Sequence, residues 1–390
     1  MPAPTDRLLA RLLAALDGEL VAAEALRERL HAHPELAYAE HATAAAVLDA
    51  LAADRVERVA GGTGILARLG PAGDGAVALR AELDGLRQTE RTGAPFAAPA
   101  GTMHGCGHDI HMAALVALFR AARHVELPVP LVAVFQPSEE DYPSGALRLV
   151  EEGALDGVAT VAAAHVHPDV APGAVTADDG PVNASSDNFR IVVDGHAGHA
   201  AYPHVTRDPV VVLAEIVVAA QTLVSRTVDP LHSAVLSITQ LTAGTGAENI
   251  VPEHAVAGGT LRALHPDDRT ALKARLAGLI DGIGRAHGCA ARLEMTSGEP
   301  AIVNDPALTA AVRPLLATAG CAAAAPMRSC GSDDFGFFGE HARLLLLFTG
   351  FETAPGTPRV PLHHPRFLPA RGSVATVARA LACAYVAAAT

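Results

Sequence analysis

Short apolar segments alternate with helix-like segments along residues 6–164 of this 390-residue chain. Helical periodicity is predicted at residues 6–30, 41–52, 109–123 and 144–152. Buried strands are predicted at residues 65–69, 76–83, 131–135 and 158–164. Strands that alternate with helices favour a mainly parallel sheet with helices on its faces. Half of the residues are hydrophobic, which is enough to bury such a sheet, so the predicted fold class is α/β.

A different pattern begins near Pro181 and ends near Gly298. It predicts, in order, a strand at 188–193, a helix at 208–227, strands at 233–241 and 255–264, a helix at 266–286 and a strand at 291–295. The order β-α-β-β-α-β is that of ferredoxin-like α+β domains. The α/β pattern then returns, with a helix from residue 305, a strand at 344–348 and a helix at 373–388. We therefore predict a discontinuous α/β domain of residues 1–182 and 299–390, into which residues 183–298 are inserted.

A Cys-x-His pair lies in a glycine-rich turn just before the helix predicted at residues 109–123. Cys106 and His108 could bind one metal ion as thiolate and imidazole, and the start of a helix favours a thiolate. The spacing alone is not specific, because such pairs are more often incidental than metal ligands.

An acidic segment follows the strand predicted at residues 131–135 and contains Glu139 and Glu140. One carboxylate could bind a metal ion while its neighbour acts as general base toward a metal-activated water. The alternative is an ordinary solvated loop with an acidic run.

Two histidine pairs supply further candidates. His165 and His167 follow the strand predicted at 158–164, and His363 and His364 lie near the C-terminus. Taken singly, each histidine is more typical of a core or surface residue. Together, these groups suffice for two metal ions about 3.5–4 Å apart, the spacing of two-metal hydrolases. Thiolate and imidazole suit zinc, whereas carboxylate and imidazole also suit manganese, cobalt or nickel.

Several motifs, in order along nearly the whole chain, carry a resemblance to a known family. They are LHAHPELAYAE (30–40), RAELDGL (80–86), GTMHGCGHDIHMA (101–113), FQPSEED (135–141), AAHVHP (163–168), GHAGHAAYPH (195–204), ENIVPE (248–253), GSDDFGFF (331–338) and LHHP (362–365). With them, the chain resembles the co-catalytic metallo-amidohydrolases, which include hippurate hydrolase, indole-acetyl-amino acid hydrolase and bacterial aminoacylases and carboxypeptidases. The combination of motifs is highly specific.

The resemblance implies two divalent transition-metal ions per chain, whether zinc, manganese, cobalt or nickel. It places their ligands at Cys106, His108, Glu140, His165 and His363, with Cys106 shared by both metals.

The resemblance also implies catalytic roles. Glu139 matches the general base and acid. His199, in the inserted domain, matches a histidine that steadies the developing oxyanion in the active site of the other subunit, and Asn249 lies in a motif that contacts substrate. The inserted domain is implied to act as a lid and to carry the contact of a homodimer.

The chain departs from the family pattern in two places. Glu82 stands where the family usually has Asp, and His364 stands where Asn is commoner. His364 is thus a second candidate beside His363, just as His167 is a second candidate beside His165.

The predicted function is metal-dependent hydrolysis of the amide bond of small N-acyl amino acids, with Glu139 as general base and acid. A carboxypeptidase or dipeptidase that uses the same site is the first alternative. A metal-binding module without catalysis is the second, and the presence of Glu139 beside all five ligands argues against it.

Composition restricts the partners and the compartment. The net charge of −13 argues against a nucleic-acid partner. No uncharged apolar run approaches ~20 residues, so no membrane partner is expected. Residues 1–17 are more typical of an amphipathic helix than of a signal peptide. Five widely spaced cysteines fit a reducing compartment, so we expect a cytoplasmic enzyme.

Overall fold

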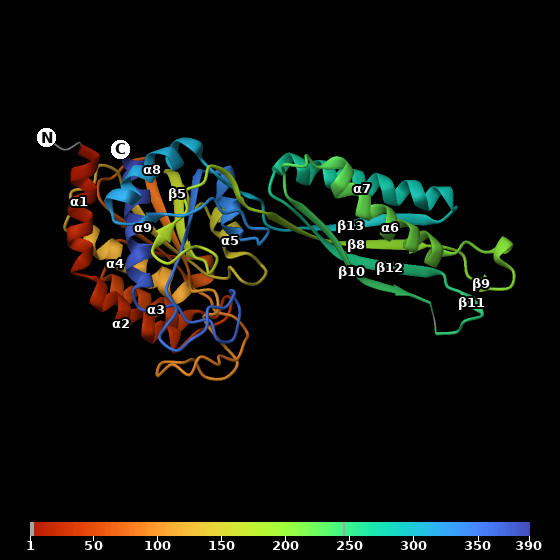
Figure 1. The fold of residues 1–390 in the computed structure, drawn as a ribbon, viewed down its shortest axis with the longest axis horizontal. Coiled ribbons are helices and arrows are strands. Elements are labelled where there is room, and N and C mark those ends of the chain that lie inside the picture. The colour runs from red at the N-terminus through yellow and green to blue at the C-terminus, as the bar shows by residue number, and fades with distance from the viewer. Residues whose placement is uncertain (1–3, 245) are drawn as a thin grey trace. The chain divides into compact units, whose positions relative to one another are not determined.

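The computed structural model describes residues 4–244 and 246–390 (Figure 1). Residues 1–3, the start of the predicted N-terminal amphipathic segment, lie outside the described residues. The chain divides into two compact units: unit 1 is formed by Met1–Gly180, Val303–Met327 and Phe337–Thr390, and unit 2 by Pro181–Ile302 and Arg328–Gly336. The domain limits drawn from the sequence, with an insertion at residues 183–298, stay a prediction.

The larger sheet has a parallel centre. Its strands are β1 (Val56–Val59), β2 (Gly64–Leu69), β3 (Ala76–Glu82), β4 (Leu131–Gln136), β5 (Val158–Val166), β6 (Ala174–Val175), β7 (Gly180–Asn183), β14 (Ile302–Asn304), β15 (Ala322–Ala323) and β16 (Arg343–Thr349). The order is β1-β2-β4-β3-β5-β16-β14-β7, with β6 and β15 paired beside this path. Strands β4, β3, β5, β16 and β14 pair in parallel, whereas β1, β2 and β4 pair antiparallel. The predicted α/β fold with a mainly parallel sheet is confirmed.

Helices of unit 1 pack on this sheet and on one another. They are α1 (Pro4–Asp17), α2 (Leu20–His31), α3 (His41–Leu51), α4 (His108–Ala122), α5 (Gly145–Glu151), α8 (Pro306–Thr318) and α9 (Ser373–Ala389). α4 contacts β3, α9 contacts β5, and α1 and α2 both pack on α4 (Figure 1). Because α4 has neighbours on several sides, almost all of its residues are buried, among them the polar residues His108, Asp109 and His111 of its first turn.

The helical periodicity predicted at residues 6–30 corresponds to two helices. α1 ends at Asp17 and α2 begins at Leu20. The N–H of Gly18 bonds to the carbonyl of Ala15, three residues back, which tightens the last turn of α1. Glycine inside a helix costs up to about 1 kcal/mol relative to alanine, so a break at this position is favoured.

Unit 2 follows the predicted order of elements. They are β8 (Ser185–Asp194), α6 (Pro209–Thr227), β10 (Ala234–Ala243), β12 (His254–Ala263), α7 (Pro266–Ala286) and β13 (Ala290–Ser297). The four strands form an antiparallel sheet of order β10-β12-β8-β13. α6 and α7 pack side by side on it and share its apolar core (Figure 1). A separate two-stranded pair joins β9 (Gly198–His199) to β11 (Ile250–Val251).

α6 is long and apolar enough, by length and composition alone, to cross a membrane. Its side chains Val212, Leu213 and Ile216 are buried in the core of unit 2, whereas Val211 and Val218 are exposed. One face of the helix therefore already has a partner in the sheet.

A buried carboxylate ties one end of the unit 2 sheet, where the start of β8 lies beside the end of β13, to α7. Asp187, near the start of β8, accepts hydrogen bonds from Arg269 and Lys273 at 2.7–2.8 Å. It also accepts one at 3.2 Å from the N–H of Gly298, just after β13. Burial raises the pKa of Asp187, but the two cations outweigh burial and hold this pKa below its usual value. Asp187 is therefore ionised and fully paired in the fold.

Candidate metal centre

The carboxyl ends of three neighbouring parallel strands meet at one edge of the unit 1 sheet. Asp84 follows β3, Glu140 follows β4, and His165 lies near the end of β5. Ligands of open α/β sheets bind outside this edge. The turn that leads into α4 contributes Cys106 and His108, so residues far apart in the sequence meet here.

All five predicted metal ligands lie together in unit 1. The ligand atoms of Cys106, His108 and Glu140 are within 4.8 Å of one another. His165 Nε2 lies 3.4 Å from Cys106 Sγ, and His363 Nε2 lies 3.3 Å from Glu140 Oε1. The His363 side chain is 50% exposed, whereas that of His108 is 1% exposed. His363 therefore forms the open side of the cluster.

Backbone hydrogen bonds fix the tautomers of two of these histidines. His108 Nδ1 donates to the carbonyl of Asp84 at 2.8 Å, and His165 Nδ1 donates to the carbonyl of Val166 at 2.7 Å. In both rings Nε2 therefore carries the free lone pair when the ring is neutral. Metal-binding histidines commonly use their other ring nitrogen in this way, because the bond fixes the ring orientation.

The residues of the cluster fit a divalent transition metal. Among the described residues, the buried atom His108 Nε2 makes no hydrogen bond. Burying a polar atom without a partner costs about 1–3 kcal/mol, and a bound cation would supply the missing partner. Thiolate, imidazole and carboxylate together form a ligand set of the kind used by zinc and related metals.

Electrostatics at the cluster also favour a cation. Burial raises the pKa of the Cys106 thiol well above its usual value, and the neighbouring carboxylates Glu140 and Glu139 raise it further. Burial lowers the pKa of His108, but the carboxylates of Glu82 and Asp84 outweigh it and raise this pKa to about 10. Excess negative charge therefore holds protons on both groups, and a divalent cation would take their place.

A strained turn presents Glu139 and Glu140. Ser138, just before them, has a φ of 51°, which is uncommon for a residue other than glycine. Glu40 Oε1 accepts the N–H of Ser138 at 2.9 Å, and Asp84 Oδ2 accepts the N–H of Glu140 at 2.9 Å. The buried carboxylates of Glu40 and Asp84 thus hold the N–H groups of Ser138 and Glu140, on either side of Glu139. Because Glu40 is buried, its pKa is raised to about 7.

The second member of each histidine pair lies elsewhere. His167 Nδ1 accepts the N–H of Asp169, and His364 Nδ1 accepts the N–H of Arg366. By contrast, His165 Nε2 lies 3.4 Å from Cys106 Sγ, and His363 Nε2 lies 3.3 Å from Glu140 Oε1. The geometry therefore favours the first histidine of each pair as the ligand.

The two predicted substrate-contacting residues are neighbours in unit 2. His199 pairs with Ile250 across β9 and β11, and the N–H of Ala200 donates to the carbonyl of Asn249 at 2.9 Å. His199 Nδ1 accepts the N–H of Ala201 at 3.1 Å. Its Nε2 therefore carries the proton, and the exposed ring can donate a hydrogen bond.

A buried charge network anchors the start of α4. Arg27 and His31 of α2 both bond to the carboxylate of Asp109, at 2.7 and 2.9 Å, and His31 also bonds to Glu90 at 3.2 Å. Both ring nitrogens of His31 face carboxylates, so the ring is held as the cation. Burial lowers the pKa of His31, but Asp109 and Glu90 outweigh it and raise this pKa to about 9.

We expect His31 to make the fold more stable at pH 6 than at pH 10. A histidine whose pKa is raised by folding contributes stability that is complete below its unfolded pKa and is lost as the pH rises through the folded value. The wild type should therefore be more stable than His31→Gln at pH 6, and this difference in free energy of unfolding should shrink by up to about 3 kcal/mol between pH 6 and pH 10. Denaturant unfolding of both proteins across this range measures it, with exposed His124→Gln as control. A difference that does not change with pH would contradict the assignment.

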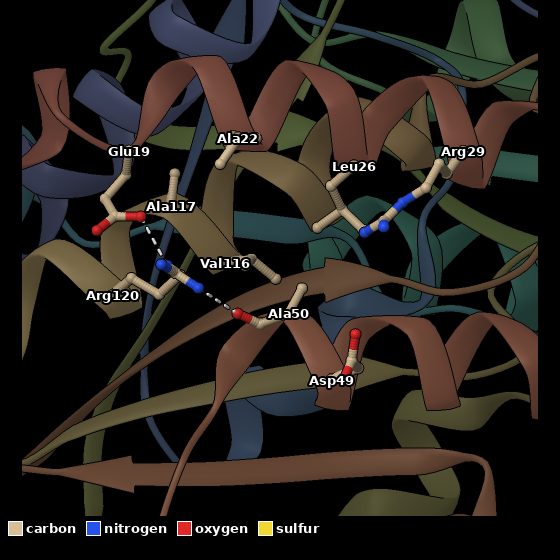
Figure 2. A pocket seen from close by; sticks show the side chains of 10 residues that line it. Glu19, Ala22, Leu26, Arg29, Asp49, Ala50, Val116, Ala117 and Arg120 are labelled. Carbon is tan, nitrogen blue, oxygen red and sulfur yellow. Dashed lines mark hydrogen bonds and ion pairs between the residues drawn. The ribbon is translucent and has the colours of Figure 1, made fainter.

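A surface pocket of about 200 Å³ lies among α2, α3 and α4 (Figure 2). Its Arg120 donates to the carboxylate of Glu19 at 2.6 Å and to the carbonyl of Ala50 at 3.0 Å. Arg29 and Asp49 also line it, but none of the predicted metal ligands is among its lining residues. We therefore assign it no part in the candidate site.

Comparisons with a family model, with known proteins and with solved structures point to the same family. The model of peptidase family M20/M25/M40 matches residues 78–385. N-acetyl-L-cysteine deacetylase of Bacillus subtilis (strain 168) is 34% identical over 361 residues, which cover 91% of this chain and 84% of that protein. N-acetyldiaminopimelate deacetylase of Bacillus pumilus (strain SAFR-032) is 32% identical over 359 residues, 90% of this chain and 94% of that protein. The solved Bacillus subtilis YXEP protein, described as a dinuclear metal binding peptidase from the M20 family, superposes with a TM-score of 0.82 at 28% identity and covers 95% of this chain and 98% of its own.

Proposed function

Because this chain belongs to peptidase family M20/M25/M40, we propose that it is a metal-dependent amidohydrolase that cleaves the amide bond of N-acyl amino acids. The observation that carries the proposal is the cluster of thiol, imidazole and carboxylate groups at the strand ends, with Glu139 beside it. Relatives named as deacetylases of N-acetyl-L-cysteine and N-acetyldiaminopimelate support a small N-acyl amino acid as substrate. The predicted family resemblance is confirmed.

The residues that would hold two divalent metal ions are Cys106, His108, Glu140, His165 and His363, with Cys106 shared between the ions. When bound, such ions lower the pKa of water and polarise the amide carbonyl. The mixed set of ligands suits zinc, manganese, cobalt or nickel.

Glu139 is the proposed general base and acid. Its Oε2 lies 3.7 Å from His108 Nε2, and its side chain is 11% exposed, so it borders the cluster and can still be reached by water. Glu139 takes a proton from the water that attacks the amide carbonyl. It then gives that proton to the leaving amine as the C–N bond breaks, which releases a carboxylic acid and an amino acid.

Unit 2 would contribute to substrate binding and assembly. We assign its β-α-β-β-α-β arrangement to an inserted ferredoxin-like lid that also carries the contact of a homodimer. His199 would donate from Nε2 to the developing oxyanion in the active site of the other subunit, and Asn249 would contact the substrate.

Hydrolysis of a library of N-acyl amino acids and dipeptides by metal-reconstituted protein, read by mass spectrometry, tests this function. We expect release of free amino acids from acyl substrates and slower cleavage of dipeptides. Preferential cleavage of dipeptides would instead favour a dipeptidase or carboxypeptidase. Binding of two metal ions without any hydrolysis would favour a non-catalytic metal-binding module.

A further inference from the structure

A buried hydrogen-bond network joins the strands that carry the candidate ligands. Arg80 and Glu82 lie on β3, and Gln136 is the last residue of β4. Arg80 donates to Gln136 Oε1 at 2.9 Å and to Glu82 Oε1. All three residues are at most 2% exposed, so water does not compete for these bonds.

His111, in the first turn of α4, extends the network to β5. Its Nδ1 donates to Glu82 Oε2 at 2.8 Å, and its Nε2 accepts the N–H of Val166 at 3.1 Å. Because an amide N–H can only donate, Nε2 must carry the lone pair and Nδ1 the proton. Both ring nitrogens are thus engaged. His111 is therefore not available as a metal ligand, although its ring lies within 4.8 Å of the ligand atoms of His108 and His165.

Val166 connects this network to the metal centre in two ways. Its carbonyl accepts the hydrogen bond from His165 Nδ1, while its N–H is held by His111. Its side chain also packs on Gly107, in the turn before α4, where an added Cβ would lie 2.4 Å from the Val166 methyl group. A displacement of Val166 would therefore move both the His165 ring and this turn.

We propose that Glu82 and His111 are a positioning pair that directs His165 Nε2 toward Cys106 and thereby sets the affinity of the centre for its metal ions. This inference rests on the proposed function, because it takes His165 to be a metal ligand. Groups that orient metal ligands contribute about 10- to 100-fold to metal affinity. The length of Glu82 matters here, since one carboxylate oxygen meets Arg80 and the other meets His111. Glu82→Asp shortens this side chain, and we expect it to weaken at least one of the two contacts.

Titration of metal-free protein with Zn²⁺, together with absorption spectra of the Co²⁺ form, tests the pair. His111→Phe removes both hydrogen bonds at similar ring size, and we expect it to weaken the tighter Zn²⁺ affinity by about 10- to 100-fold and to shift the visible Co²⁺ bands. His111→Gln should be intermediate, because its amide oxygen can still accept the N–H of Val166. Both variants should still take two ions per chain at saturating metal. His124→Phe, at an exposed histidine just after α4, should leave the affinity and the spectrum unchanged.

Equal affinity for wild type, His111→Gln and His111→Phe would overturn the proposal. Loss of one ion per chain at saturation would also overturn it, because it would mark His111 as a ligand. If circular dichroism shows that His111→Phe does not fold, Glu82→Asp is measured in its place. An unchanged Zn²⁺ affinity and an unchanged Co²⁺ spectrum in Glu82→Asp would then contradict the proposed pair. These readouts are independent of turnover, so a wild type that binds two ions but hydrolyses no N-acyl amino acid would contradict the proposed function alone.

Discussion

Replacing Glu139 with glutamine should lower kcat for N-acyl amino acids by about 10²- to 10⁴-fold, while the protein still binds two metal ions per chain. Glutamine has nearly the shape of glutamate but cannot take a proton from water at neutral pH. The five proposed ligands are left unchanged, and Glu139 borders them, with its Oε2 3.7 Å from His108 Nε2. Steady-state kinetics, with metal content measured by elemental analysis of the same samples, separate the loss of the base from a loss of metal.

Asp141→Asn is the matched control for this experiment. Asp141 lies two residues further along the same loop and is exposed, so the same change of charge there should leave kcat within about twofold of the wild type. If Glu139→Gln retains full activity, the assigned mechanism is wrong. If it loses its metal ions, Glu139 is a ligand rather than the base.

Replacing Cys106 with alanine should remove the group that both metal ions are proposed to share. We expect fewer than two ions per chain and a fall in kcat/KM of more than about a hundredfold, because even groups that merely orient ligands are worth about 10- to 100-fold. Cys106 lies within 4.8 Å of the ligand atoms of His108 and Glu140 and 3.4 Å from His165 Nε2. Isothermal titration with Zn²⁺ and kinetics at saturating metal would measure the two effects.

The exposed cysteine Cys330 provides the control, since Cys330→Ala removes a thiol outside unit 1. That variant should bind two ions and turn over at the wild-type rate. Two ions bound with wild-type affinity in Cys106→Ala would show that the thiolate is not a ligand.

Long elements of the fold follow from the sequence because their patterns are strong. The apolar periodicity predicts a helix at residues 266–286, and α7 has those bounds. Pairs such as β6 and β15 are two residues long, too short to show a period, and they form only because strands from distant segments already lie beside them. Strand β1 was not predicted from the sequence for another reason: three of its four residues are exposed, so it has no apolar pattern of a buried strand.

Glu140 and His165 could be singled out because such side chains are unusual directly after buried strands, whereas Cys106, His108 and His363 were assigned from the motifs of the family resemblance. Glu40 and His111 were not singled out, although both lie in motifs that carry the family resemblance. Their roles depend on backbone N–H groups far along the chain: Ser138 is 98 residues from Glu40, and Val166 is 55 residues from His111. No local pattern encodes such a bond, so only the folded chain reveals it.

The carboxylate of Asp187 has a practical consequence for chemical labelling. The sequence contains one lysine, Lys273, and its ammonium group is bonded to that carboxylate, with the side chain 25% exposed. The contact with Asp187 covers part of the Lys273 nitrogen, so an acylating reagent reaches it best when this contact opens. The rate at which Lys273 is labelled therefore measures how often Asp187 releases it. Labelling at Lys273, read by peptide mapping, thus reports loosening of the end of the unit 2 sheet where β8 starts and β13 ends.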